Sequence, residues 1–337
     1  MRWVVADPGP SFSVQDVRNG WVEALRDLGQ HVIEFNLGER LSFYGNAHIR
    51  HGDDWKPAVT AEGAYDLAVN SLYSTLYQAW PDVLLVVSGF FIPAKLLDRA
   101  KRTRTRVVIV HTESPYEDKR QVELAQWADI NLVNDPTNLE QFPAGTRYVP
   151  HAYRPSVHCP GPAKPELVCD LGFVGTGFPS RVWFFEQMDL SGLDVILGGN
   201  WMSLSPDSPL HKYVSHNIDE CLDNDQAVEI YRSAKVGINL YRREAEAPQL
   251  ASGWSMGPRE VELAATGCFF LRDPRPESND VLGMLPAFTS PEEASEQLRY
   301  WLPRDAERER LAVQARQAVA DRTFHHHAKS LLRLLDA

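Results

Sequence analysis

Short apolar segments alternate with amphipathic segments along most of the chain, and this alternation restricts the fold more than any other feature. In the first half, apolar segments of strand length occupy residues 3–6, 31–35, 83–87, 107–110 and 130–133. Between the first two, residues 14–28 place Val17, Trp21 and Leu25 on one helical face. Parallel strands need long crossover connections, so this order predicts a parallel sheet covered by helices on both faces.

A proline-rich stretch at 150–165 interrupts this order, and its prolines (Pro150, Pro155, Pro160, Pro162 and Pro165) exclude a helix. The alternation then resumes, with strands at 170–174, 194–197, 236–240 and 268–271 and helices at 181–188, 226–234 and 258–265. We therefore expect two doubly wound α/β domains at residues 1–155 and 166–315, facing a cleft. A last helix, 316–337, is expected to pack back on the first domain. Residues 37–60 fit neither period and are predicted to form a surface loop.

The size and composition are those of a globular protein with two cores. The chain has 337 residues, of which 44% are hydrophobic and 23% charged. No apolar run reaches the roughly 18 residues of a membrane-spanning helix. The four cysteines include no C-x-x-C pair. We expect a cytoplasmic protein without a membrane span.

The net charge of -11 disfavours non-specific binding to a polyanion, but one local cluster of cations stands out. It runs from Lys95 to Arg106, and its last three arginines are candidates for contact with an anionic acceptor: Arg102, Arg104 and Arg106. The alternative is a solvated helix end that leads into the next strand.

Two segments of the second domain carry the features of a nucleotide site. Gly175 and Gly177 follow a strand and precede a helix that Ser180 is expected to cap. Arg181, close behind, is a candidate for contact with a diphosphate. The third glycine of a dinucleotide fingerprint is absent. Tight turns alone would also explain this pair of glycines.

The second segment, 257–271, begins a helix with a proline and ends it with a glycine. Arg259 and Glu262 are three residues apart and share a helical face. A guanidinium near a helix N-terminus suits a diphosphate, and a carboxylate one turn later suits the two hydroxyls of a ribose. A surface ion pair is the alternative.

The run P-R-x-x-E-x-x-A-x-G-x-x-x-L at 258–271 resembles the nucleotide-sugar helix of GT-B glycosyltransferases, in particular the group related to the spore-maturation protein CgeB. Further segments resemble that group in the same order: 111–117, 128–135, 149–153, 170–175 and 230–240. The resemblance extends over residues 80–335. It departs at Trp254, where related retaining enzymes often carry the first glutamate of an E-x7-E motif, so the sugar and the stereochemical outcome stay open.

This resemblance implies two Rossmann-like domains and transfer of a sugar from a nucleoside diphosphate donor, with a UDP-sugar favoured, to a hydroxyl acceptor. A hydroxymethylated DNA base is the leading special case among acceptors. No metal and no other cofactor is expected. The consecutive histidines at 325–327 do not suggest a metal site, because neighbouring side chains on a helix point about 100° apart and cannot converge on one ion. The alternatives are a nucleotide-sugar-binding protein without turnover and a GT-B-fold nucleotide-sugar epimerase.

Roles for further residues follow from the same resemblance. Asp7, His111 and Glu113 end strands of the first domain and are the candidate catalytic residues, one of them as general base for an inverting reaction. A structural role is the alternative for His111. Asn200 and Trp201 follow a strand of the second domain and are candidate donor contacts. Trp201 would stack on the nucleobase or else pack in the interior.

Overall fold

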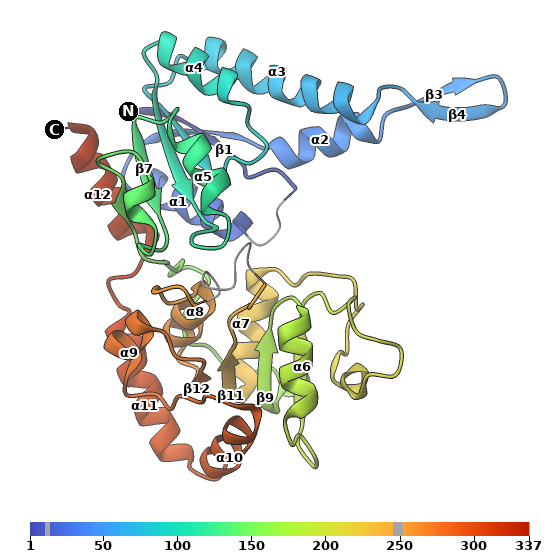
Figure 1. Ribbon diagram of the computed structural model, residues 1–337, viewed down its shortest axis with the longest axis vertical. Helices are drawn as coiled ribbons and strands as arrows, with labels where there is room; N and C mark the ends of the chain where they lie inside the picture. The colour runs from blue at the N-terminus through green and yellow to red at the C-terminus, as the bar shows by residue number, and fades with distance from the viewer. Residues whose placement is uncertain (11–13, 245–251, 337) are drawn as a thin grey trace. The chain divides into compact units, whose positions relative to one another are not determined.

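The computed structural model describes residues 1–10, 14–244 and 252–336 (Figure 1). The chain forms two compact units. Unit 1 comprises Met1–Val149 together with Phe324–Ala337, and unit 2 comprises Pro150–Thr323.

Unit 1 is built on a six-stranded parallel sheet in the order β2-β1-β5-β6-β7-β8. Its strands are β1 (Arg2–Ala6), β2 (His31–Phe35), β5 (Val83–Val87), β6 (Arg106–His111), β7 (Ile130–Val133) and β8 (Arg147–Tyr148). β5 lies between β1 and β6, and all five of its residues are buried. This agrees with the prediction of a parallel sheet covered on both faces.

The helices of unit 1 are α1 (Gln15–Asp27), α2 (Leu37–Gly45), α3 (Ala61–Ala79), α4 (Ala94–Arg102), α5 (Asp118–Ala125) and α12 (Phe324–Asp336). α12 packs on α1, although some 300 residues separate them in sequence. Gly20 permits this contact, because a Cβ atom there would lie 2.1 Å from the ring of Phe324. Trp21 meets the same ring edge-on, with centroids 6.3 Å apart.

The prediction of a surface loop at 37–60 is wrong. Asn36 caps α2 by accepting a hydrogen bond from the backbone of Glu39 at 2.8 Å. An antiparallel hairpin follows, formed by β3 (His48–His51) and β4 (Asp54–Pro57), and it projects from unit 1 (Figure 1). All eight strand residues are exposed, so no apolar alternation marked them in the sequence.

Unit 2 contains a four-stranded parallel sheet in the order β10-β9-β11-β12. Its strands are β9 (Cys169–Val174), β10 (Val195–Gly198), β11 (Ala234–Asn239) and β12 (Phe270–Arg272). Its helices are α6 (Pro179–Gln187), α7 (Asn224–Ser233), α8 (Pro258–Thr266), α9 (Pro276–Leu282), α10 (Pro291–Trp301) and α11 (Asp305–Ala318). No helix within the described ranges combines the length and apolarity that a bilayer crossing requires.

The strand order of unit 2 creates a switch point. β10 lies on one side of β9 and β11 on the other, so the connection from β9 to β10 and the connection from β10 to β11 run in opposite directions across the sheet. In open α/β sheets ligands bind beyond the carboxyl ends of the strands at such a point. The residues that follow β9 and β11 are therefore where a ligand site is expected.

Candidate functional site

The guanidinium of Arg259, from the first turn of α8, lies at the switch point of unit 2. Its Nε donates to the carbonyl of Val174 at 2.6 Å, at the end of β9. Its Nη1 donates to the side chain of Asn239 at 3.4 Å and to the carbonyl of Leu240 at 3.3 Å, at the end of β11. Gly175 makes room for it, because a Cβ atom there would lie 2.3 Å from Nη2. Arg259 thus bridges the two strands where they diverge.

Among the described residues, no carboxylate pairs with the positive charge of Arg259. Its hydrogen-bond acceptors are neutral carbonyl and amide oxygens, and its guanidinium lies 4.5 Å from the centre of the Phe173 ring. Asn239 is 1% exposed, and its Nδ2 has no hydrogen-bond partner in the described part of the chain. A buried N–H without an acceptor is costly, and an anion beside Arg259 would satisfy both groups.

Buried hydrogen bonds fix the first turn of α8. The backbone N–H of Gly257 donates to the hydroxyl of Tyr241 and to Glu260, both at 3.1 Å. Tyr241 donates to the same carboxylate in a short hydrogen bond, and Ser278 donates to its other oxygen at 2.7 Å. Burial raises the pKa of Glu260 above its usual range, and burial likewise raises that of Tyr241. Glu260 is therefore a positioning residue that holds α8 against β11 and α9.

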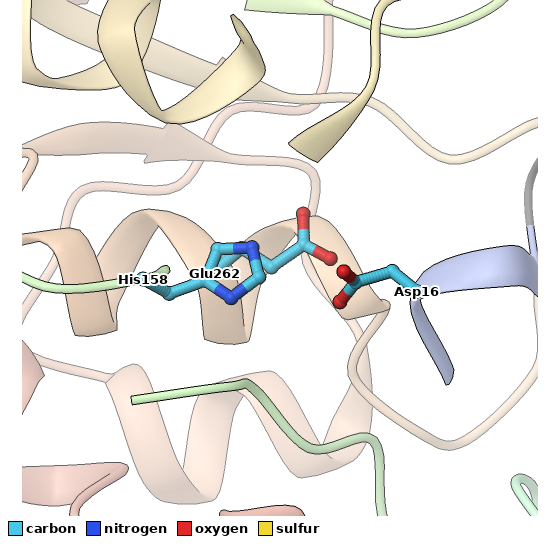
Figure 2. A group of neighbouring side chains, drawn as sticks. All are labelled: Asp16, His158 and Glu262. Atoms are coloured by element: carbon cyan, nitrogen blue, oxygen red, sulfur yellow. The ribbon is translucent and has the colours of Figure 1, made fainter. Parts of the chain in front are cut away.

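Glu262, one turn further along α8, is part of a polar group within unit 2. Asn224, at the start of α7, donates to its Oε1 at 3.4 Å and also contacts His158 Nε2 at 3.0 Å. A carboxylate oxygen of Glu262 and a ring nitrogen of His158 lie within 4.8 Å of each other (Figure 2). Asp16, also drawn in Figure 2, belongs to unit 1. Glu262 and Asn224 together offer acceptors and a donor to a vicinal diol.

Arg181 is 8% exposed, and backbone carbonyls accept hydrogen bonds from its guanidinium. Its guanidinium donates twice to the carbonyl of Leu240, at 3.1 and 2.8 Å, and once to that of Thr176 at 3.0 Å. It thereby ties the glycine loop after β9 to the end of β11. The side chain predicted to meet a diphosphate instead supports the loop that surrounds Arg259.

The structure contradicts a stacking role for Trp201. Its side chain is fully buried against Phe173 and Phe185, and its indole N–H donates to the carbonyl of Gly198 at 3.0 Å. Gly177 packs on its ring, where a Cβ atom would lie 2.5 Å away. Asn200 stabilises the adjacent turn through bonds with Asp219 and Met202. Both residues shape the loop after β10 from within.

Ser180 is not the cap of α6, which begins at Pro179 after Phe178. Its backbone N–H and its hydroxyl donate to the carboxylate of Glu244, at 2.9 and 3.1 Å. The N-terminus of α6 therefore already holds an anionic group. Although burial opposes this, the hydrogen bonds lower the pKa of Glu244 below its ordinary value.

In unit 1, His111 is fully buried at the end of β6 and cannot reach an acceptor hydroxyl. Its Nε2 meets the side-chain oxygen of Asn131 at 2.9 Å, and its ring packs on Phe142. Burial lowers the pKa of His111 to about 4. This environment fits the structural role that the sequence analysis gave as the alternative for His111.

Asp7 and Glu113 also follow strands at the carboxyl edge of this sheet. Asp7 is 1% exposed, and its Oδ1 accepts from Gly9 at 2.7 Å and from Gly38 at 3.2 Å. It thus joins the loops that follow β1 and β2. Glu113 is half-buried, and Gln121 accepts from its backbone N–H at 3.0 Å. Of the three predicted catalytic residues, Glu113 is the most accessible to solvent.

The three predicted acceptor-binding arginines lie at the other edge of the sheet. Arg102 ends α4 and pairs with Asp98 at 2.8 Å. Arg104 lies in the following turn, and Arg106 begins β6 and donates to the carbonyl of Leu335 at 2.6 Å. Ligands of open α/β sheets bind at the carboxyl edge, so this position does not favour contact with an acceptor in the reaction.

Sequence reasoning missed Asn239, Asn224 and His158 as members of the site. Asn239 carried a usable signal, because it is the polar residue that ends an apolar strand at the switch point. Asn224 and His158 carried none. They lie 38 and 104 residues before Glu262, and only the packing of α7 on α8 and the path of the linker bring them near it.

Comparison with solved structures identifies the fold over the whole chain. Sucrose-phosphate synthase from Thermosynechococcus elongatus superposes with a TM-score of 0.65 at 12% identity, covering 99% of both chains. HepE from Anabaena, in complex with UDP-glucose, gives 0.61 at 11% identity with 99% of both chains covered. An α-glucosyltransferase in complex with UDP and a 13-mer DNA gives 0.65 at 13% identity, covering 99% of this chain and 98% of the other. This is the GT-B glycosyltransferase fold.

The sequence itself matches a family model described as glycosyl transferase-like over residues 181–333. The matched stretch contains α8 with Arg259 and Glu262, and it is slightly less than half of the 337 residues. No curated protein matches the sequence. The chain therefore has the GT-B fold, and its residues 181–333 resemble a glycosyltransferase family. The closer resemblance to the CgeB-related group stays a prediction.

Proposed function

We propose that this protein transfers a glycosyl residue from a nucleoside diphosphate sugar, a UDP-sugar in the first place, to a hydroxyl group. The observation that carries the proposal is Arg259 at the switch point beside Asn239, whose side-chain Nδ2 has no hydrogen-bond partner among the residues that the structure describes. Two of the structural neighbours, HepE and the α-glucosyltransferase, were solved with UDP-glucose or UDP, and their fold extends over the whole chain.

In such a reaction the bond between the anomeric carbon and the diphosphate oxygen breaks, and a bond to the acceptor oxygen forms. The leaving diphosphate gains negative charge in the transition state. Arg259 and the N-terminus of α8 are placed to stabilise that charge, and Asn239 Nδ2 can donate to the same group. The hydrogen bonds of Glu260 fix the N-terminus of α8, and those of Arg259 fix its guanidinium, so little reorganisation is needed. This protein-derived charge is the reason that we expect activity without a metal ion.

Glu262 would hold the nucleotide through the ribose. Its carboxylate can accept from both ribose hydroxyls, and Asn224 keeps one carboxylate oxygen in place. Gly175 and Thr176 leave the backbone after β9 accessible beside Arg259. The position that retaining relatives fill with a glutamate holds Trp254, so we leave the stereochemical outcome to experiment.

The acceptor hydroxyl must lose its proton during transfer. Glu113 is our candidate for the general base, because Asp7 and His111 are almost completely buried. A hydroxymethylated DNA base stays among the acceptors to be tested, since one structural neighbour was solved with DNA. Arg102, Arg104 and Arg106 play no part in this proposal because they lie at the opposite edge of the sheet.

The experiment incubates the protein with isotope-labelled UDP-glucose, with and without hydroxymethylated duplex DNA, and resolves the products by chromatography. Transfer to DNA or slow release of free glucose and UDP would support a transferase. Both should fall at least tenfold in Arg259→Ala and Glu262→Ala, while Arg310→Ala on α11 serves as a surface control.

Other outcomes would replace the proposal. An altered sugar still attached to UDP identifies an epimerase. Binding of a nucleotide sugar, seen as a thermal shift across a panel of donors, without turnover of any of them identifies a binding protein.

A further inference from the structure

A surface of unit 1 combines exposed aromatic rings with arginines at the amino edge of its sheet. We name it the aromatic-basic edge, and its members are Tyr73, Tyr77, Trp80, Arg99, Arg102 and Arg104. Trp80 is 60% exposed and Tyr77 43%. The surface has no part in the proposed transfer reaction, whose residues follow the carboxyl ends of strands.

Contacts between side chains bring these residues together from two helices and two turns. The guanidinium of Arg99 on α4 lies 4.7 Å from the ring centre of Tyr73 on α3. The rings of Tyr73 and Tyr77 are 4.8 Å apart, and those of Tyr77 and Trp80 are 6.0 Å apart. The two turns are joined as well, because Thr105 donates to the carbonyl of Pro81 at 3.0 Å. Trp80 and Arg104 thus belong to adjoining turns.

Trp80 and Arg104 both adopt a left-handed backbone conformation that is unfavourable for residues with a side chain. Trp80 caps α3 with φ of 44°, and Arg104 has φ of 61°. Glycine is the residue that this left-handed conformation favours, and it is the usual choice after a helix end. Among the described residues only one other non-glycine, Ser88, has a positive φ. Outliers of this kind cluster at functional sites.

The charges of the aromatic-basic edge are only partly balanced. Arg102 pairs with Asp98 at 2.8 Å, and the neighbouring Lys101 pairs with Asp129 at 3.1 Å. Neither Arg99 nor Arg104 forms an ion pair with any residue that the structure describes. Guanidinium groups bind phosphates in a planar, bidentate way, and exposed indole and phenol rings stack on bases of any sequence.

We propose that the aromatic-basic edge binds single-stranded nucleic acid, with bases stacked on Trp80 and Tyr77 and phosphates held by Arg102 and Arg104. A single strand fits better than a duplex because its bases are free to stack on the exposed rings. It fits better than an anionic membrane because the turns between 80 and 106 expose no large aliphatic side chain that would enter the bilayer.

The experiment measures fluorescence anisotropy of a labelled 20-nucleotide oligo-dT strand without any nucleotide sugar, so failure of the transferase proposal does not affect it. We expect saturable binding at 50 mM salt. Trp80→Gly and Arg104→Gly should each weaken it about tenfold, whereas Trp183→Ala, an equally exposed tryptophan on α6, and Arg310→Ala should not. The double variant Arg102→Ser and Arg104→Gly should reduce the slope of log affinity against log salt by about 1.4.

Glycine suits both strained positions, so both variants should fold, and thermal unfolding monitored by circular dichroism checks this. Because the proposal requires bases that stack on the aromatic rings, an abasic strand of the same length should not bind. The proposal is overturned if oligo-dT does not bind at 50 mM salt, or if binding is indifferent to both glycine variants. It is also overturned if only vesicles containing phosphatidylserine bind.

Discussion

Two arginines near the carboxyl edge of the sheet in unit 2, Arg259 and Arg181, have different roles. Arg259 is half-buried and has no carboxylate partner among the described residues, so its charge is available to a ligand. Arg181 is 8% exposed, and its donors are engaged by backbone carbonyls of two separate loops. The sequence predicted a donor contact for both, because each lies in the first turn of a helix that a glycine-containing segment precedes.

Replacement of Arg181 should therefore affect folding. Arg181→Ala leaves the carbonyls of Leu240 and Thr176 without their donor in a buried environment. We expect a loss of about 2–4 kcal/mol in the free energy of unfolding, measured with urea. Arg310→Ala, on the exposed face of α11, is the matched control and should change stability by less than about 0.5 kcal/mol. An unchanged urea midpoint for Arg181→Ala would contradict this assignment.

His111 predicts a dependence of stability on pH. Burial lowers its pKa to about 4 from an ordinary value of 6.5. Between these values the unfolded chain binds more protons, so stability is full above pH 6.5 and is lost as the pH falls toward 4. At pH 5 this residue alone should cost about 2 kcal/mol relative to pH 7. Urea unfolding at both pH values should show a smaller difference for His111→Gln than for the parent protein; an equal difference would refute the argument.

At the scale of elements, the strands with apolar cores and the helices that cover them were predictable. β5 and β9 have uninterrupted apolar stretches because both faces are covered. The β3–β4 hairpin was not predictable, since its eight exposed residues follow no hydrophobic period. The same limit applies to Trp201, because a tryptophan after a strand has the same sequence whether it points into the core or into a ligand site.

The attachment of α12 to unit 1 depends on a small contact surface. Phe324 is 5% exposed and fills the space left by the missing side chain of Gly20. Phe324→Ala should lower the free energy of unfolding by about 3–5 kcal/mol. Protease digestion should then cleave the chain between unit 2 and α12 faster than in the parent. Leu302→Ala, in unit 2, is a control that should not accelerate this cut, and equal cleavage of parent and Phe324→Ala would show that α12 does not depend on this contact.

At the scale of the whole molecule, the site was predictable in its chemistry and only partly in its members. Arg259 and Glu262 could be recognised because both lie on one helix, where spacing determines which face they share. Asn239, Asn224 and His158 come from other segments, and their approach to α8 depends on tertiary packing. Asp7 and His111 do not fit their predicted catalytic role for a related reason, because burial at the end of a strand is not visible in the sequence. Glu113, which is half-buried, stays a prediction.

The most direct test of the account is calorimetric titration of UDP into the protein and into Arg259→Ala, with Arg310→Ala as the matched control. We expect one site per chain in the parent and in the control. In Arg259→Ala the affinity should fall at least tenfold, because the diphosphate loses its only nearby guanidinium without a carboxylate partner among the described residues. Absence of UDP binding to the parent, or equal affinity in Arg259→Ala, would contradict the claim that α8 and the switch point of unit 2 form a nucleotide-sugar site.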